Sequence, residues 1–238
     1  IFADLSIAGP GFINITLTDA FLGDWISRIS ADPRHGVPIA SAPRRIVMDY
    51  GGPNVAKSMH VGHLRSSIIG DSLHRLIAFV GDDVVSDIHL GDWGLQMGLL
   101  IVELKRRQPD LPFFDPDNYG PWPEESPVTI EDLEDMYPIA SARTTAKEGD
   151  DEATLEAKRI ARDEARAATA ELQRGNPGYY ALWKHFRAVS MEALKRDFSS
   201  LQVDFDLWYG ESDAQSLIPE MIEHLRTGGF VEESDGAQ

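Results

Sequence analysis

The chain has 238 residues, of which 42% are hydrophobic, and this content suffices for one large core or for a core with an appended subdomain. It contains no cysteine, which excludes disulfide bonds, a thiolate nucleophile and a cysteine-bound zinc ion. The formal net charge of −17 argues against a dedicated nucleic-acid surface, because phosphate binding depends on clustered lysine and arginine.

Residues 1–25 have the pattern expected of the tail of a preceding N-terminal domain. Residues 12–17 alternate apolar and polar side chains, as a strand does, but a single short strand has nothing here to pair with. The start of the chain lacks the features of a signal peptide, and no run of 18 apolar residues occurs, so we expect a cytoplasmic protein without a membrane partner. The chain begins with Ile1 and ends in GGFVEESDGAQ, the pattern of a strand and a turn, and we expect it to be a fragment.

The sequence pattern of residues 26–108 predicts an α/β fold, namely the first half of a Rossmann-like catalytic domain with a parallel sheet. After a loop rich in proline, glycine and serine, residues 45–50 form an apolar run that ends in GGPN, as a buried strand does before a turn. Apolar residues then recur at helical spacing over 61–80. A second strand at 83–89 and a second helix at 91–107 complete a β-α-β-α order, which is typical of a parallel sheet.

Residues 109–200 predict an acidic helical insertion in this fold. A proline-broken connector comes first, and Thr129 with Asp132 then forms a capping box at the start of a helix. Between positions 115 and 170 the chain has 15 acidic and 6 basic residues. The remainder is only mildly acidic, so a local basic groove stays possible elsewhere.

Two long helices are predicted at 152–174 and 179–201. The second carries a row of aromatic and aliphatic residues from Tyr180 to Phe198, which we interpret as core and not as a platform for stacking bases. Residues 201–238 alternate apolar and polar positions again in VDFDLWYGESD, and there we expect the chain to return to the sheet.

The stretch NVAKSMHVGHLRSS places His60, Gly62 and His63 at the first turn of the helix that follows the first strand. A helix N-terminus offers unpaired N–H groups and a partial positive charge, so phosphates bind there. The two imidazoles, three residues apart, can donate N–H bonds to phosphate oxygens, and the bare Gly62 lets an adenine or ribose lie against the backbone. The arrangement suits a nucleotide whose α-phosphate is attacked and whose pyrophosphate leaves.

Two simpler interpretations compete with this one. Histidines on helices are usually structural, and an H-x-G-H tetrapeptide can arise by chance. The position of this motif, between a buried strand and a long amphipathic helix, nevertheless favours the phosphate site. A zinc site would need a third ligand beside His60 and His63, and because the sequence offers no convincing one, we predict no metal site.

The segment GGPNVAKSMHVGHLRSSIIGD, followed by HLGDWGLQMG and later by YGESD, closely resembles the arginyl-tRNA synthetases, which are class I aminoacyl-tRNA synthetases. The likeness runs from about Pro10 to the C-terminus and is strongest between 45 and 100. It implies that the complete enzyme joins L-arginine to ATP as arginyl-adenylate, with Mg²⁺ accompanying the triphosphate, and transfers the arginyl group to the 3′ end of tRNA(Arg). It also implies that the first step requires tRNA.

The resemblance assigns the site residues to two groups. Those expected to bind arginine are Asp49, Gly52, Pro53, Asn54 and His63. Those expected to bind ATP are His60, Gly62, His63 and Lys57, and His60, His63 and Lys57 are also the expected catalytic residues. Many members of this family lack a lysine-bearing second signature and use a lysine just before the first, the place of Lys57. The family commonly has serine where this chain has Gly52, so a contact there must use the backbone N–H.

Other motif residues are expected to be structural. Trp93 and Gln96 should pack under the pocket, and Asp92 should cap the second helix. Gly210, Glu211 and Ser212 should form a turn.

Two alternatives remain open at the level of sequence. A small nucleotidyltransferase uses a similar H-x-G-H turn, but it should be complete in fewer than about 200 residues, without an acidic helical insertion or LGDWG. A non-catalytic tRNA-binding paralogue should bind tRNA without pyrophosphate exchange, and the intact histidines argue against it. The second signature and any anticodon-binding helices are not in this sequence, so we expect the 238-residue chain to be inactive alone. We also expect a monomer.

Overall fold

The computed structural model describes residues 1–57 and 59–232. The chain divides into two compact units, Ile1–Ile46 with Arg75–Val84, and Val47–His74 with Val85–Gln238. All of the residues singled out as site candidates belong to the second unit. Within the described ranges, no helix has the length and the apolar character needed to cross a bilayer.

The first unit contains a β-hairpin and a helix. Strand β1 (Phe2–Ala8) pairs antiparallel with β2 (Phe12–Leu17), and the turn between them uses Gly9 and Gly11 at positive φ. The expectation that residues 12–17 have no partner was therefore wrong, because the Gly-Pro-Gly turn folds the chain back onto the preceding residues. Helix α1 (Asp19–Ala31) begins at Thr18, whose hydroxyl oxygen accepts a bond from the Phe21 N–H, and this helix runs across the division expected at residue 25.

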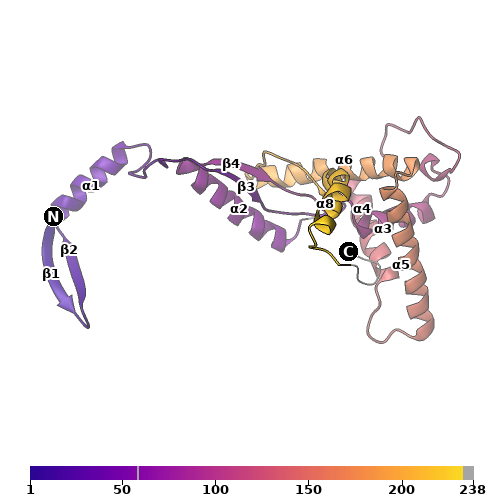
Figure 1. Ribbon diagram of the computed structural model, residues 1–238, viewed down its shortest axis with the longest axis horizontal. Helices are drawn as coiled ribbons and strands as arrows, with labels where there is room; N and C mark the ends of the chain where they lie inside the picture. The colour runs from indigo at the N-terminus through magenta and orange to yellow at the C-terminus, as the bar shows by residue number, and fades with distance from the viewer. Residues whose placement is uncertain (58, 233–238) are drawn as a thin grey trace. The chain divides into compact units, whose positions relative to one another are not determined.

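The predicted β-α-β unit is confirmed. Strand β3 (Arg45–Asp49), helix α2 (Val61–Phe79) and strand β4 (Asp83–Asp87) follow one another, and the two strands are parallel neighbours in one sheet (Figure 1). Strand β4 ends two residues before the predicted end, where His89 adopts a positive φ. Asp87 at the end of β4 and Leu90 after it form parallel bridges with Leu207 and Gly210, so the chain pairs with β4 again in the segment where a return to the sheet was expected.

Helix α2 makes a close contact with the turn after β3. Its buried residues are Ser67 and Gly70, and a Cβ at Gly70 would overlap the ring of Tyr50. Several of its apolar side chains are instead exposed, namely Val61, Leu64, Ile68, Ile69, Leu73, Leu76 and Phe79. The helical spacing therefore predicted the helix correctly. However, within the described residues these apolar side chains of α2 remain exposed.

The remaining helices form most of the core of the second unit. They are α3 (Leu95–Arg107), η1 (Pro112–Phe114), α4 (Ile130–Thr144), α5 (Glu152–Gln173), α6 (Pro177–Ser200), α7 (Glu211–Ala214), η2 (Gln215–Leu217) and α8 (Ile218–Thr227). Helices α3, α4 and α5 pack against one another (Figure 1). Residues 228–232 after α8 form no strand, and the rest of the strand and turn expected at the C-terminus lies outside the described residues.

Most predicted helix boundaries agree with the structure to within two residues. Thr129 and Asp132 form the expected capping box of α4, and Asn176 caps α6 through its side-chain oxygen. Helix α3 begins four residues later than predicted, because the backbone of Gly91 pairs with Pro53 and Val55. The aromatic row of α6 is mainly core, with its large rings buried apart from the partly exposed Tyr180.

Candidate functional site

The two motif histidines lie together at the N-terminus of α2. Their rings are stacked, with centroids 3.8 Å apart and planes inclined by 18°. The His60 N–H donates to Nδ1 of His63 over 3.3 Å, and the Gly62 N–H donates to Nδ1 of His60 over 3.1 Å. Because both Nδ1 atoms accept hydrogen bonds, a neutral ring carries its proton on Nε2. Each imidazole therefore has an Nε2–H group that can donate to a ligand.

The bare position at Gly62 has a different neighbour from the one expected. A Cβ at Gly62 would lie 2.9 Å from Cε1 and 3.0 Å from Nδ1 of His60. The absence of a side chain at this position thus gives room to the His60 ring, which folds back over the helix start. Gly62 contributes to the site by allowing the two imidazoles to stack.

His63 is the more enclosed of the two histidines, and its pKa lies below the ordinary value of 6.5. Burial is the main cause, and the positive charges of His60 and Lys57 lower the pKa further. In the folded protein His63 is therefore neutral at pH 7, which is the form with one Nε2–H donor and one Nδ1 acceptor.

This lowered pKa predicts a pH dependence of stability. The unfolded chain binds a proton on His63 near pH 6.5, whereas the folded chain binds it only at lower pH, so stability is complete above about pH 6.5 and decreases as the pH falls below it. An NMR titration should give a His63 midpoint below 6.5, and His63→Gln should flatten the loss of stability between pH 6.5 and 5. A midpoint at or above 6.5 would contradict this assignment.

The turn after β3 brings Asn54 to the loop that follows β4. Asn54 bridges to Gly91 in parallel fashion, and its Oδ1 accepts a bond from Nε2 of Gln96 over 3.4 Å. Nε2 of Gln96 also donates to the Gly91 carbonyl oxygen over 2.7 Å. A Cβ at Gly91 would overlap Oδ1 of Asn54. Gln96, expected only to pack under the pocket, thus orients the Asn54 amide.

The other residues of this turn differ in exposure. Pro53 is buried, whereas Gly52 is exposed and adopts a positive φ of 53°. Asp49 ends β3 with an exposed side chain, and within residues 1–57 and 59–232 its carboxylate has no hydrogen-bond or ion-pair partner. This carboxylate is therefore available to a cationic ligand.

Lys57 points to the helical region that follows α3. Its Nζ lies 4.3 Å from the ring centroid of Tyr137, a residue of α4. This is cation–π geometry.

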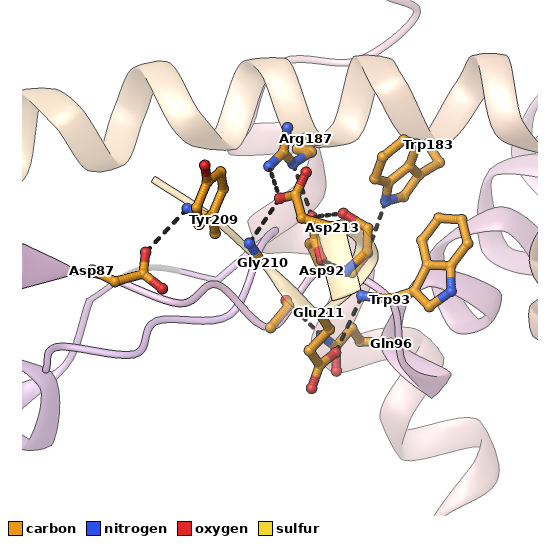
Figure 2. A network of polar contacts seen from close by, with 12 residues as sticks. Asp87, Asp92, Trp93, Gln96, Trp183, Arg187, Tyr209, Gly210, Glu211 and Asp213 are labelled. Carbon is orange, nitrogen blue, oxygen red and sulfur yellow. Dashed lines mark hydrogen bonds and ion pairs between the residues drawn. The ribbon is translucent and has the colours of Figure 1, made fainter. Parts of the chain in front are cut away.

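A buried carboxylate anchors the loop between β4 and α3 (Figure 2). Asp92 has no exposed surface, and its carboxylate accepts bonds from the Ser212 N–H at 2.9 Å, the Ser212 hydroxyl at 2.7 Å and Nε of Arg187 at 2.8 Å. Its carbonyl oxygen accepts from Nε1 of Trp183. The expectation that Asp92 caps α3 was wrong: the N-cap residue is Gly94, and Asp92 instead neutralises a guanidinium from α6.

The same guanidinium continues the network to α7 (Figure 2). Arg187 also bonds to Oδ2 of Asp213 over 2.8 Å, and that oxygen accepts the Gly210 N–H. Glu211 accepts the Trp93 N–H at 3.3 Å. The expected turn at 210–212 is thus the start of a short helix whose side chains hold the loop before α3. Sequence reasoning did not identify Arg187, which lies 95 residues from Asp92.

An open cavity of about 500 Å³ lies beside this network, at the end of β4. Its lining residues are Asp87, His89, Tyr209, Gly210, Asp213, Ala214 and Leu217. The size is in the range of small-molecule sites. Both carboxylates already have partners, Asp87 with the Tyr209 N–H and His89, and Asp213 with Arg187.

Across residues 1–57 and 59–232, no group of three or more histidine or acidic side chains is arranged to hold a metal ion.

Comparison with known proteins gives a consistent result. Residues 26–238 match the family described as tRNA synthetases class I (R), catalytic domain. The chain is 55% identical over 231 residues to an arginine–tRNA ligase of Maricaulis maris, covering 97% of this chain and 37% of that protein. It is 50% identical over 237 residues to an arginine–tRNA ligase of Francisella tularensis subsp. novicida, covering 100% of this chain and 39% of that one.

Solved structures support the fold. The arginyl-tRNA synthetase of Plasmodium falciparum superimposes with a TM-score of 0.61 at 21% identity, over 99% of this chain and 37% of that one. The arginyl-tRNA synthetase of Thermus thermophilus gives a TM-score of 0.59 at 20% identity, over 95% of this chain and 32% of that one. This chain therefore spans less than two fifths of the length of these relatives.

Proposed function

This chain belongs to the family of class I tRNA synthetases (R), catalytic domain, and from that premise we propose that it carries part of the active site of an arginine–tRNA ligase. In the proposed reaction, the carboxylate of L-arginine attacks the α-phosphate of ATP, pyrophosphate leaves and arginyl-adenylate forms. The arginyl group then passes to the 3′ end of tRNA(Arg). The family match favours this proposal over the smaller H-x-G-H nucleotidyltransferases.

The stacked pair of His60 and His63 is the observation that carries the proposal. The two imidazoles at the N-terminus of α2 have their Nδ1 atoms occupied by backbone N–H groups, which leaves two Nε2–H donors for phosphate oxygens. The helix dipole adds a partial positive charge at the same place. These groups stabilise negative charge that develops as pyrophosphate leaves, without acid–base chemistry.

Lys57 and Gly62 complete the proposed ATP-binding set. Lys57 supplies a cation for the triphosphate, and Gly62 permits the stacked arrangement of the imidazoles. Mg²⁺, the usual companion of a triphosphate, is bound mainly through phosphate oxygens and water and needs few protein ligands.

The turn after β3 is the proposed arginine site. Asp49 offers an exposed carboxylate for a cationic group, and the Asn54 amide, oriented by Gln96, offers a hydrogen-bonding group. The backbone of Gly52 and Pro53 shapes the turn between them, with the Gly52 N–H replacing the family's usual serine hydroxyl. His63 is proposed to contact both substrates.

Binding of ATP with Mg²⁺ to the 238-residue chain, measured by calorimetry, tests the proposal. His60→Asn and His63→Asn should each weaken ATP binding about tenfold, because each removes a donor to a charged phosphate. His74→Asn, also on α2 but away from its first turn, is the matched control and should leave binding unchanged. Gly91→Ala should weaken arginine binding while sparing ATP, because its Cβ displaces the Asn54 amide.

Equal ATP affinity in the wild type and both histidine variants would refute the proposed phosphate site. Arginine-dependent pyrophosphate exchange by a longer form of the protein separates a synthetase from a non-catalytic tRNA-binding paralogue. The 238-residue chain itself should show no exchange.

The organisation of the chain is part of the same proposal. Residues 1–25 would be the tail of an N-terminal domain, 26–108 the first half of the catalytic domain, 109–200 an insertion and 201–238 the return to the catalytic domain. A role in translation supports the expected cytoplasmic location, and we keep the expectation of a monomer.

A further inference from the structure

The loop between the turn and α2 contains a residue in an uncommon backbone conformation. Ala56 has a φ of 63°, in the left-handed region that non-glycine residues rarely adopt. Val55 and Ala56 are both completely buried. Such a conformation persists only where the surrounding structure holds it in place.

The group that holds Ala56 comes from α6. The Ala56 N–H donates to Oγ of Ser190 over 3.0 Å, and Ser190 is itself 1% exposed. Because both groups are buried, no solvent can replace the hydroxyl as a partner for this N–H. The left-handed turn at Ala56 therefore depends on a hydrogen bond to a residue 134 positions later in the sequence.

The next residue, Lys57, is fixed by a second contact with the same helical region. Its ammonium group lies 4.3 Å from the ring centroid of Tyr137 on α4, a half-buried residue that packs against the core. The Lys57 charge also lowers the pKa of His63. The Lys57 ammonium group, while it contacts the Tyr137 ring, is therefore still close enough to act electrostatically on the stacked imidazoles. Tyr137 thus holds the cation beside the proposed phosphate site.

We propose that Ser190 and Tyr137 are positioning residues for Lys57: the 109–200 segment holds the loop in its left-handed turn and presents the ammonium group to the triphosphate of ATP. This inference rests on the proposed function and gives the helical segment a role in the activation step. Ser190 sets the path of the backbone, and Tyr137 sets the direction of the side chain.

Paired variants of the 238-residue chain test the inference through ATP affinity. Tyr137→Leu removes the aromatic face and should weaken ATP binding about threefold, whereas Tyr137→Phe keeps the face and should bind like the wild type. Ser190→Ala should weaken ATP binding about tenfold. Adding Ala56→Gly to Ser190→Ala should recover most of that loss, because glycine adopts the left-handed turn without support. Arginine affinity should change less than twofold in all four.

A spectroscopic measurement gives a readout that does not depend on ATP. The ε-methylene signals of Lys57 should be shifted upfield by the Tyr137 ring in the wild type and in Tyr137→Phe, and should return to ordinary values in Tyr137→Leu. The upfield shift should be smaller in Ser190→Ala than in the wild type, and the double variant with Ala56→Gly should restore it. A merely structural role for Ser190 predicts no recovery by Ala56→Gly.

The outcomes separate this inference from the function on which it rests. Unshifted Lys57 signals in the wild type overturn the inference alone, as does ATP affinity that is equal in wild type, Ser190→Ala and Tyr137→Leu. Failure of the unaltered chain to bind ATP overturns the proposed function and the inference together.

Discussion

Replacing Arg187 with methionine should lower the free energy of unfolding by about 3 kcal/mol, because it leaves a buried carboxylate without its charge partner. Asp92 has no exposed surface, and the guanidinium is its only cationic neighbour within the described residues. Arg187 also bridges to Asp213, so the variant loses the connection between the loop before α3 and the start of α7. Arg187→Lys keeps a charge but cannot form both bonds in the same geometry, and should lose an intermediate amount.

The control for Arg187 is an ion pair of the same type on the surface. Arg174 and Glu171 lie 3.0 Å apart with side chains that are 74% and 49% exposed. Arg174→Met should change stability by less than about 0.5 kcal/mol. Urea unfolding of the wild type and the three variants provides the comparison, provided that their m-values are equal. A loss below about 1 kcal/mol for Arg187→Met would show that Ser212 alone satisfies Asp92.

Gly98→Ala should destabilise the second unit by about 2 to 3 kcal/mol, although alanine favours helices. Gly98 lies in α3 where the backbone of α5 approaches closely, and a Cβ there would overlap the Ala165 carbonyl oxygen and the Thr169 hydroxyl. Backbone atoms of α5 cannot rotate away as a flexible side chain could. The two helices must therefore separate, with loss of packing along their shared face.

Gly23→Ala provides the matched control, since Gly23 is also a glycine inside a helix. No heavy atom lies within 4 Å of a Cβ at Gly23 in α1. The substitution should stabilise that helix by about 0.5 to 1 kcal/mol, the ordinary difference in propensity. Hydrogen exchange should be slower at the α1 amides in Gly23→Ala and faster at the α3 amides in Gly98→Ala, each compared with the wild type. Equal stabilisation would mean that the close approach of α3 and α5 is absent in solution.

Helix positions could be predicted from the sequence where local signals fix them. The capping box of Thr129 and Asp132 acts over three residues, and α4 begins directly after the predicted cap. Helix α6 begins two residues before the predicted position, because Asn176 caps it and Pro177 occupies its first turn. The stacked histidines follow from the same local logic, because residues three apart on a first turn face the same side.

Features that depend on distant residues could not be predicted in this way. The pairing of β1 with β2 was missed because only residues 12–17 were taken as a strand, although residues 3–7 also alternate and the Gly-Pro-Gly turn between the two stretches indicates a hairpin. The role of Asp92 was missed because its partner Arg187 lies on another helix, and helix-cap rules describe only neighbours in sequence. The residue roles in substrate binding remain predictions.

The return of the chain to the sheet has a consequence for the order of assembly. Ser86 and Asp206 exchange hydrogen bonds across 120 positions, and closing a loop of that length from a disordered chain carries an entropic penalty that grows with its logarithm. Helices α3 to α6 lie between the two residues and pack on one another, with α3 against both α4 and α5, so they can form first and bring the distant ends together. The late, rate-determining event of refolding should then be the docking of residues 203–210 against a helical scaffold that is already in place.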